Sequence, residues 1–328
     1  MGIQKYKSEY KKGIKNTIGD VYGVRIGHTT IHQGDIHTGV TIVLPSTESI
    51  FLHKLPAAMH VINGFGKTTG LVQIDEMGVL ESPIALTNTL SVGTVQQALV
   101  NYMLQQHRDI GNTTGTINVV VGECNDSYLN DIRLCYIEPQ HVYDAIKSAN
   151  NEVEEGSVGA GAGMSCYEMK GGIGSSSRIV TLDNKEYVIG TLVLSNFGLK
   201  SDFIGEGKAE VDIEQGSCMM IIATNIPMDS RQLKRVCKRM AAPLCKTGSY
   251  LGNGSGDIAL AFSTASSIPH YRRHDIMHFP VVHESCMDTI FRASIDSMQE
   301  AILSSLWHSH TTVGRNGNIR DSIHDLNK

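Results

Sequence analysis

The chain has 328 residues, of which 41% are hydrophobic and 19% are charged, and its formal net charge is −5 at pH 7. The acidic excess argues against a nucleic-acid-binding surface, which carries a basic excess. No apolar stretch is as long as a membrane span, which needs about 18 residues. The basic N-terminus lacks the apolar segment of a secretory signal.

The cysteines indicate a compartment. There are seven, an odd number without any C-x-x-C pair, which argues against a disulfide framework and against a structural zinc site. Free thiols are typical of a reducing compartment. We therefore expect a cytoplasmic protein that binds neither nucleic acid nor a membrane.

The N-terminal half alternates apolar runs with helical patterns. Residues 1–19 are polar and are expected to form an arm. Continuous apolar runs at 40–44 (VTIVL) and 116–121 (TINVVV) are typical of strands that are covered on both faces. Residues 94–106 have apolar side chains at helical spacing, and residues 138–147 begin beside a proline, so both are expected to be helices.

The C-terminal half begins with a glycine-rich segment. Seven glycines within residues 156–178 predict tight turns or close backbone approaches rather than a regular helix or strand. Strands are expected at 187–194, 218–224 and 255–264, and helices at 229–244 and 288–307. Residues 308–328 are polar and are expected to be a tail. This mixture, without an internal repeat, predicts an α/β layered domain.

Sequence motifs for cofactors and metals are incomplete. No P-loop, dinucleotide fingerprint or G-x-S-x-G motif is present in full. His270, His274, His278 and His283 share one loop at irregular spacing, and histidines that lie on the surface or pack against a partner are a better interpretation than a metal site. We therefore expect no cofactor and no metal.

Three separated segments carry a family resemblance. They are residues 156–178 (GSVGAGAGMSCYEMKGGIGSSSR), 194–198 (LSNFG) and 247–264 (TGSYLGNGSGDIALAFST), with weaker matches at 39–45, 60–71, 122–133 and 291–302. Together they resemble the self-processing aminopeptidases of the DmpA type, which include L-aminopeptidase/D-Ala-esterase/amidases and β-aminopeptidases. The resemblance runs from about residue 19 to residue 307.

The resemblance implies a fold and a maturation step. The implied fold is a four-layer αββα sandwich, similar to N-terminal-nucleophile hydrolases but with a different connectivity, in one catalytic domain over residues 20–307. The chain is expected to cut itself between Gly254 and Ser255, into residues 1–254 and 255–328. The two pieces are expected to stay together, and such pairs to assemble further, often as a homotetramer.

The chemistry of Ser255 fits that maturation step. A serine hydroxyl needs a nearby base to act as a nucleophile. Cleavage before Ser255 would free its own α-amino group, whose reference pKa of about 7.7–8.0 lets it accept the hydroxyl proton near neutral pH. Gly254 has no Cβ to obstruct attack on its carbonyl group. The expected reaction releases N-terminal residues from short peptides, amides or esters through an acyl-Ser255 intermediate.

Further site residues are expected on both sides of the reacting bond. By resemblance, Asn196 in the N-F-G turn corresponds to the family's hydrogen-bond donor to the oxyanion. An aminopeptidase must also recognise a free amine, and the carboxylate of Glu123 in GECND is the candidate for this role. Tyr136 is a weaker candidate for the pocket or for an oxyanion contact.

A Ser-x-acid pair on the C-terminal helix is implied to hold the freed amine. Ser294 and Asp296 match this pair best. A second frame stays open, in which Ser297 takes the serine position, Gln299 replaces the acid and Glu300 lies next to it.

Two other functions stay open. Ornithine acetyltransferases share the implied fold, but they use a Thr nucleophile where this chain has Ser255. A non-processing relative would bind an amine-bearing ligand or act as a scaffold, and Gln299 in the second frame keeps this alternative open. Whether the chain is cut distinguishes the non-processing relative, and glutamate-dependent deacetylation of N-acetylornithine would indicate the acetyltransferase.

Overall fold

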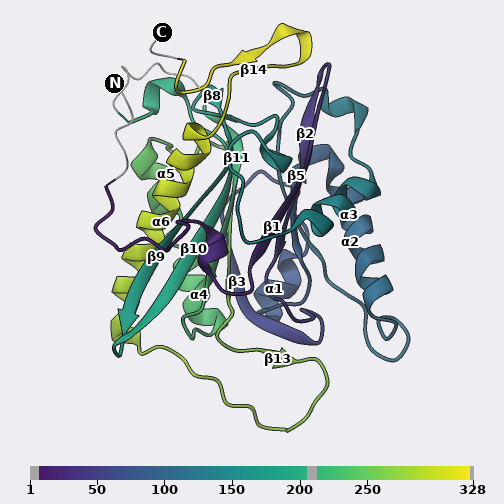
Figure 1. Ribbon diagram of the computed structural model, residues 1–328, viewed down its shortest axis with the longest axis vertical. Helices are drawn as coiled ribbons and strands as arrows, with labels where there is room; N and C mark the ends of the chain where they lie inside the picture. The colour runs from purple at the N-terminus through teal and green to yellow at the C-terminus, as the bar shows by residue number, and fades with distance from the viewer. Residues whose placement is uncertain (1–6, 205–212, 326–328) are drawn as a thin grey trace.

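Two β-sheets lie face to face in the computed structural model, which describes residues 7–204 and 213–325 (Figure 1). The first sheet has the strand order β1-β2-β5-β6. The second has the order β13-β3-β12-β11-β10-β9, with β4 paired to β3. The strands of these sheets are β1 Arg25–Gln33, β2 Ile36–Leu44, β3 His53–Gly64, β4 Val79–Leu80, β5 Ile84–Asn88, β6 Val120–Cys124, β9 Gly172–Leu182, β10 Lys185–Asn196, β11 Gln215–Thr224, β12 Gly254–Ser263 and β13 Ile268–Pro269.

Helices complete the layers. α2 and α3 cover the first sheet, α4 and α6 cover the second with α5 beside α6, and α1 packs against β3 (Figure 1). The helices are α1 Leu71–Met77, α2 Val92–Gln106, α3 Pro139–Ser148, α4 Ser230–Cys237, α5 Ala241–Thr247 and α6 Met287–Trp307. The expected four-layer αββα sandwich is confirmed.

The core has two parts because the second sheet is buried on both faces. Along β11, Met219 and Ile221 belong to the apolar cluster between the sheets. Met220 and Ile222 belong to the cluster between the second sheet and its helices. This double burial is the physical reason for the continuous apolar run at 218–224.

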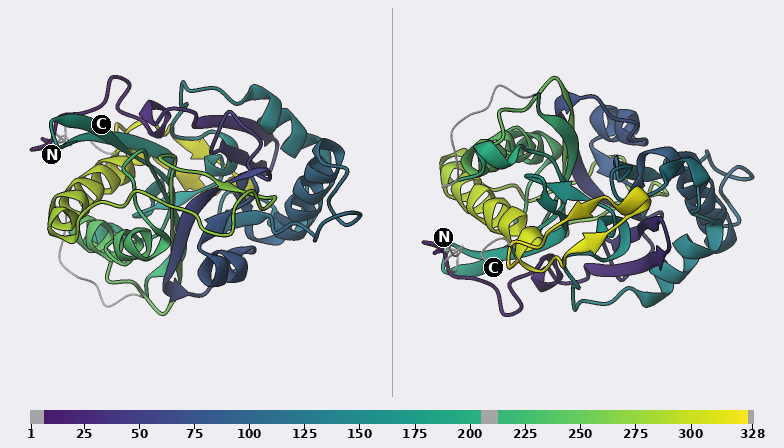
Figure 2. Two further views of the ribbon diagram at one scale, coloured as in Figure 1. Left: turned by 90° about the horizontal axis from the view of Figure 1, so that it is seen from below. Right: turned by 90° about the horizontal axis from the view of Figure 1, so that it is seen from above.

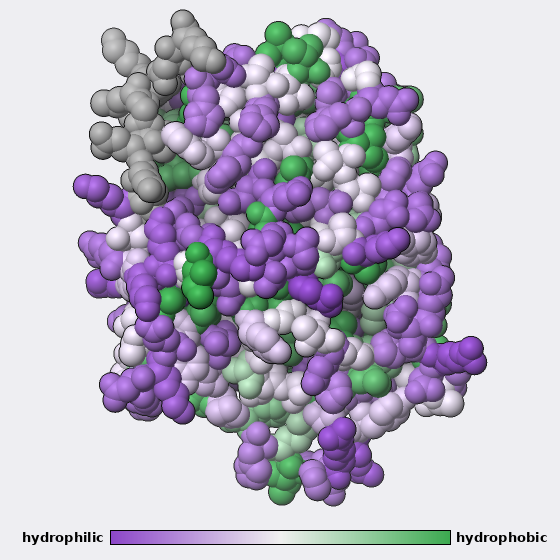
Figure 3. Space-filling model, in the orientation of Figure 1, coloured by the Kyte–Doolittle hydropathy of each residue, from purple (hydrophilic) through white to green (hydrophobic). Residues whose placement is uncertain are grey.

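The described helices include no membrane span, and the visible surface is mostly polar. None of the helices in the described residues is long and apolar enough to cross a membrane. The face shown in Figure 3 is mostly hydrophilic, and its hydrophobic residues are scattered. Scattered apolar residues are normal on a protein surface.

Two expected elements have different boundaries. The helix expected at 229–244 is split into α4 and α5, and Pro243 lies in the first turn of α5. A proline is tolerated there because its missing N–H group has no partner in a first turn, whereas inside a longer helix it would remove a hydrogen bond. The strand expected at 116–121 begins only at Val120, as β6.

The glycine-rich segment is partly a regular strand, which corrects the sequence-based expectation. β9 begins at Gly172, and α6 packs directly on it: a Cβ on Gly174 would lie 1.9 Å from the Ala301 carbonyl oxygen. Before the strand, Gly156 has a φ of +85°, and a Cβ there would lie 2.1 Å from the His308 carbonyl oxygen. The glycines therefore permit close backbone approaches, as expected, but two of the seven, Gly172 and Gly174, lie in a sheet strand.

Both ends of the described chain pack on the domain. In the N-terminal arm, Ile18 is fully buried and its N–H donates to Ser175 Oγ at 2.8 Å. The expected tail contains a hairpin of β14 (Thr312–Val313) and β15 (Ile319–Arg320), which is the yellow ribbon in the view from above in Figure 2. Residues 1–6 of the arm and 326–328 of the tail lie outside the described residues. The packed unit extends beyond 20–307 on both sides.

Candidate active site

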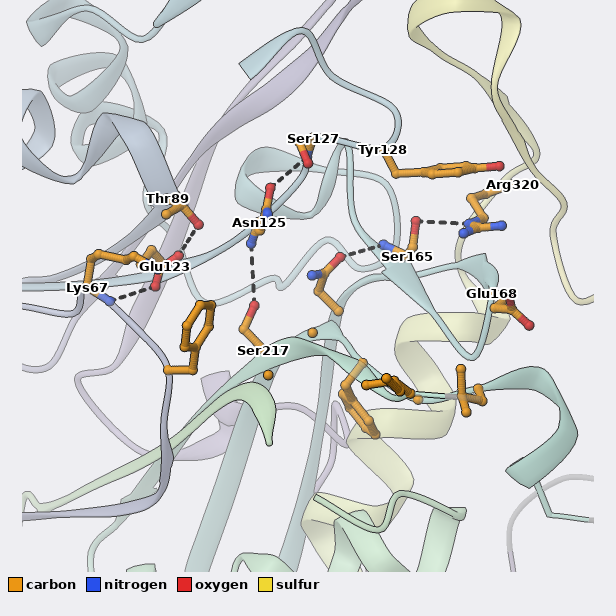
Figure 4. Close-up of a pocket in the computed structure, with 18 residues that line it drawn as sticks. Lys67, Thr89, Glu123, Asn125, Ser127, Tyr128, Ser165, Glu168, Ser217 and Arg320 are labelled. Atoms are coloured by element: carbon orange, nitrogen blue, oxygen red, sulfur yellow. Dashed lines mark hydrogen bonds between the residues drawn. The ribbon is translucent and has the colours of Figure 1, made fainter. Parts of the chain in front are cut away.

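A cavity of about 470 Å³ opens where strands of both sheets end (Figure 4). It receives residues from β6, from the end of β10, from the starts of β11 and β12, and from β15. The residues that line it are Phe65, Lys67, Thr89, Glu123, Asn125, Ser127, Tyr128, Ser165, Glu168, Asn196, Phe197, Gly198, Leu199, Ile213, Gly216, Ser217, Gly254 and Arg320.

The segment before Ser255 is held in a tight turn. The Ser255 N–H donates to the Gly252 carbonyl oxygen at 2.9 Å, and the Asn63 amide donates to that same oxygen at 2.6 Å. The buried carboxylate of Glu214 accepts hydrogen bonds from Ser249 Oγ at 2.6 Å and from the Gly252 N–H at 3.2 Å. These contacts fix the backbone that leads to the bond between residues 254 and 255.

Ser255 itself faces the helices rather than the cavity. Its Cα pairs with Gly216 across β11, and the next residue on that face, Asp257, pairs with Cys218. Cys218 belongs to the cluster between the second sheet and its helices. Ser255 is 1% exposed, whereas Gly254 lines the cavity. In the uncut chain, a substrate in the cavity is therefore separated from the Ser255 hydroxyl.

Asp257 contacts the hydroxyl of Ser255. Ser255 Oγ donates to Asp257 Oδ1 at 2.9 Å, and Asp257 Oδ2 has no hydrogen-bond partner within the described residues. Desolvation by burial raises the pKa of the Asp257 carboxyl to about 6. Sequence reasoning missed Asp257. Side chains two residues apart on a strand point to the same face, so the spacing of Ser255 and Asp257 could have indicated this contact.

Asn196 ends β10 and lines the cavity. Its Oδ1 accepts a hydrogen bond from the Ser165 N–H at 2.9 Å. Because an N–H group needs an oxygen as its acceptor, this contact fixes the orientation of the Asn196 amide. Its Cα pairs with Ser217, and Ser217 pairs with Gly256 on β12. Asn196 therefore lies about 10 Å, two strand spacings, from the start of β12.

Glu123, near the end of β6, lines the cavity, as sequence reasoning expected. It is 3% exposed, and its carboxylate accepts hydrogen bonds from the Lys67 N–H at 2.8 Å and from the Thr89 hydroxyl (Figure 4). A carboxylate can accept about four hydrogen bonds, so both oxygens keep free acceptor sites.

The structure does not bring Ser294 and Asp296 to Ser255. Ser294 Oγ donates to the Ile290 carbonyl oxygen within α6 at 2.8 Å. Asp296 pairs with Arg178, which lies on β9 opposite Ile189. Ile189 is seven residues before the cavity end of β10, about 23 Å along the strand.

The second frame does not place an acid there either. Ser297 Oγ forms a hydrogen bond with Thr191 Oγ1 at 2.8 Å, over the middle of β10. Glu300 pairs with Arg178 Nη2 at 2.6 Å. Both frames therefore lie along the middle of α6, where they connect the helix to the sheet.

Tyr136 lies outside the cavity. It is 39% exposed, and its hydroxyl donates to Gln33 Oε1 at 3.0 Å. The tyrosine that lines the cavity is Tyr128, from the same segment as Glu123. Asn125 of that segment also lines it, and its position two residues after Glu123 was the signal that could have found it.

Metal-ligating side chains do not gather in the described residues. No three His, Cys, Asp or Glu side chains in that part of the chain lie close enough to hold a metal ion. Of the loop histidines, His270 forms a hydrogen bond between its Nε2 and Thr114 Oγ1 at 2.7 Å.

Known proteins match this chain over nearly its whole length. A model of peptidase family S58 matches residues 16–320. The β-peptidyl aminopeptidase BapA of Sphingosinicella microcystinivorans is 34% identical over 343 aligned residues, which cover 94% of this chain and 85% of that protein.

Solved structures match equally well. The PH0078 protein from Pyrococcus horikoshii OT3 has a TM-score of 0.91 and 44% identity, over 97% of this chain and 94% of that chain. The L-aminopeptidase D-Ala-esterase/amidase from Ochrobactrum anthropi, described as a prototype for the serine aminopeptidases and a new variant of the Ntn hydrolase fold, has a TM-score of 0.89 and 29% identity, over 97% of this chain and 93% of that chain. The four layers of this chain are accordingly a variant of the N-terminal-nucleophile hydrolase fold.

Proposed function

This chain belongs to peptidase family S58 and is a self-processing aminopeptidase, and from this premise we propose that Ser255 is its nucleophile. The bond that is cut is the one between Gly254 and Ser255. One observation carries this proposal: Gly254 and Asn196 line the same cavity, while the hydroxyl of the residue after Gly254 donates to Asp257 at 2.9 Å.

Self-cleavage needs a proton acceptor, because the uncut Ser255 has no free amine. Asp257 accepts the hydroxyl proton, and Ser255 Oγ attacks the carbonyl carbon of Gly254. The new C–O bond forms as the C–N bond breaks, and the proton passes to the freed nitrogen. Water then hydrolyses the ester, which leaves a carboxylate on Gly254 and restores the Ser255 hydroxyl.

Cleavage also supplies a base for the later turnovers. The freed α-amine, with a reference pKa of about 7.7–8.0, serves as the base for later turnovers. The Asn196 amide donates to the oxyanion, and Glu123 binds the substrate's ammonium group. A cavity of about 470 Å³ has the size of an ordinary small-molecule site, which favours short peptides, amides and esters.

The molecule's assembly and location complete the proposal. The pieces 1–254 and 255–328 remain one pair, and such pairs associate as a homotetramer, as the family resemblance implies. All seven cysteines are free, which suits a reducing compartment such as the cytoplasm.

Intact-mass spectrometry of the purified, denatured protein tests the cut. Two species, of 254 and 74 residues with the smaller starting at Ser255, are expected. Ser255→Ala is expected to give one uncut species without hydrolysis of aminoacyl amides. A Ser255→Ala chain that still cuts itself would overturn the mechanism. An uncut wild-type chain would favour the ligand-binding relative instead.

A further inference from the structure

The cavity carries charge on two sides. Figure 4 shows Lys67 and Glu123 on one side, and Arg320 with Tyr128 and Glu168 on the other. The proposed reaction uses Glu123 for the substrate's ammonium group. Arg320, on β15 of the hairpin that follows α6, has no part in the bond-breaking step.

The guanidinium of Arg320 is held in a fixed plane. Its central carbon lies 3.7 Å from the ring centroid of Tyr128, and its Nε donates to Ser165 Oγ at 3.2 Å. These contacts use one face and the Nε–H. Within the described residues, the two terminal nitrogens make no hydrogen bond and no ion pair, so Arg320 presents a two-nitrogen edge that matches a carboxylate.

The position of Arg320 relative to the reacting carbonyl indicates which part of a substrate it meets. Ser165 connects Arg320 to Asn196, because Ser165 Oγ accepts from Arg320 and its N–H donates to Asn196 Oδ1. A substrate whose amine is bound at Glu123 and whose carbonyl lies at Asn196 extends its leaving group toward Arg320.

We infer that Arg320 binds a carboxylate on the leaving group. The preferred substrate class is therefore a dipeptide with a free C-terminal carboxylate, whose leaving group is an amino acid, in preference to amides and esters. This inference rests on the proposed function and names the substrate class of the same site.

Two other charged residues of the cavity could compete for this assignment. The ammonium of Lys67 lies 4.5 Å from the Phe65 ring centroid, on the Glu123 side, and so away from the leaving group. Glu168 shares the side of Arg320, and a carboxylate there would favour a neutral or cationic leaving group. A preference for leaving groups without a carboxylate would thus assign the subsite to Glu168.

The experiment compares matched substrates on the processed enzyme. Aminoacyl p-nitroanilides of L-Ala, D-Ala and β-Ala first identify an N-terminal residue that the enzyme releases. That residue is then joined to L-alanine, either with a free carboxylate or as the carboxamide. The value of kcat/KM should be about 10- to 100-fold higher for the free acid, as a charge-assisted hydrogen bond predicts.

Variants assign the preference to one side chain. Arg320→Gln should bring the free-acid to carboxamide ratio to about 1, mainly through a higher KM, and Arg320→Lys should keep part of it. Arg315→Gln is the matched control, because Arg315 lies in the same hairpin, pairs with Asp131 at 3.9 Å and does not line the cavity. Its ratio should equal that of the wild type.

The outcomes separate this inference from the proposed function. A wild-type ratio near or below 1 overturns the role of Arg320 while leaving the aminopeptidase intact. An equal loss for both substrates in Arg320→Gln also overturns it, since Arg320 would then act only by positioning Ser165. Failure to release any p-nitroanilide overturns the proposed function and this inference together.

Discussion

At the scale of single residues, the contact between Ser255 and Asp257 distinguishes the proposed self-cleavage from the proposed later turnovers. Before the cut, Asp257 is the carboxylate that accepts the Ser255 hydroxyl hydrogen bond. After the cut, a free α-amine is available as a second base. The two reactions should therefore respond differently to loss of the Asp257 carboxylate.

Asp257→Asn keeps the size of the side chain but cannot take up a proton. We expect self-cleavage to slow by about 100-fold or more, the usual contribution of a general base. With the pKa of Asp257 raised to about 6, wild-type self-cleavage should also slow as the pH falls through 6, because the protonated carboxyl no longer accepts a proton. To measure both effects, denatured uncut chains that retain Ser255 are refolded at pH 5 to 8, and cleavage is followed over time by intact-mass spectrometry.

The control for that measurement is Asp126→Asn. Burial also raises the pKa of the Asp126 carboxyl, to about 7, but its Oδ1 accepts from the Asn130 amide and it does not contact Ser255. Equal cleavage rates in Asp257→Asn and the wild type would remove Asp257 from the mechanism.

Residues within local motifs were predictable, and residues brought in by tertiary structure were not. Ser255, Asn196 and Glu123 stand in short distinctive segments, and the last two line the cavity as expected. Arg320 carries no local signal, because only the folding of the hairpin brings it to the cavity. Tyr136 was predicted for the pocket, whereas Tyr128 lines the cavity, because spacing alone cannot tell which tyrosine side chain turns inward.

At the scale of elements, α6 is attached to β9 by a buried charge network. Arg178, whose side chain is 0% exposed, pairs with Asp296 and Glu300 of the helix. Ser8 of the N-terminal arm also donates to Asp296 Oδ2, at 2.6 Å. The acid that resemblance assigned to the freed amine thus connects three segments of the fold.

Asp296→Asn tests whether this acid is structural. We expect the free energy of unfolding to fall by about 1.5–3 kcal/mol, because a hydrogen bond to a buried charge is weakened. Urea titration of the variant in an uncut Ser255→Ala background measures this loss. Self-cleavage of the single variant should match the wild type, and a stable variant that stays uncut would return Asp296 to the catalytic machinery.

Element positions were easier to predict than element boundaries or neighbours. The run at 218–224 became β11 because both of its faces are buried, and the helix at 288–307 became α6. Pro243 divided the helix expected at 229–244, and Pro56 lies within β3, where propensity disfavours a strand. Strand order depends on contacts between distant segments, so the layers followed from the family resemblance rather than from local patterns.

At the scale of the whole molecule, the proposed cut falls at the start of β12, a central strand of the second sheet. β12 lies between β3 and β11, pairing antiparallel with one and parallel with the other, and α6 covers β9 and β10. The shorter piece therefore shares backbone hydrogen bonds and core contacts with the longer one on several sides.

The two pieces should consequently stay together under native conditions. We expect residues 1–254 and 255–328 to co-elute in size-exclusion chromatography of the cut protein, and to separate only after addition of denaturant. The Ser255→Ala chain provides the uncut reference for elution volume. Separate native elution of the short piece would contradict the central position of β12.

The central position of β12 also has a genetic consequence. Glu123 and Asn196 precede the proposed cut and Arg320 follows it, and all three line one cavity, so in the proposed cut form that cavity is assembled from two polypeptides. Two inactive alleles, one altered in each piece, could restore each other only by exchanging pieces. Because β12 is hydrogen-bonded to a neighbouring strand on both edges, we expect folded molecules not to exchange it. Complementation is then confined to chains that fold in each other's presence.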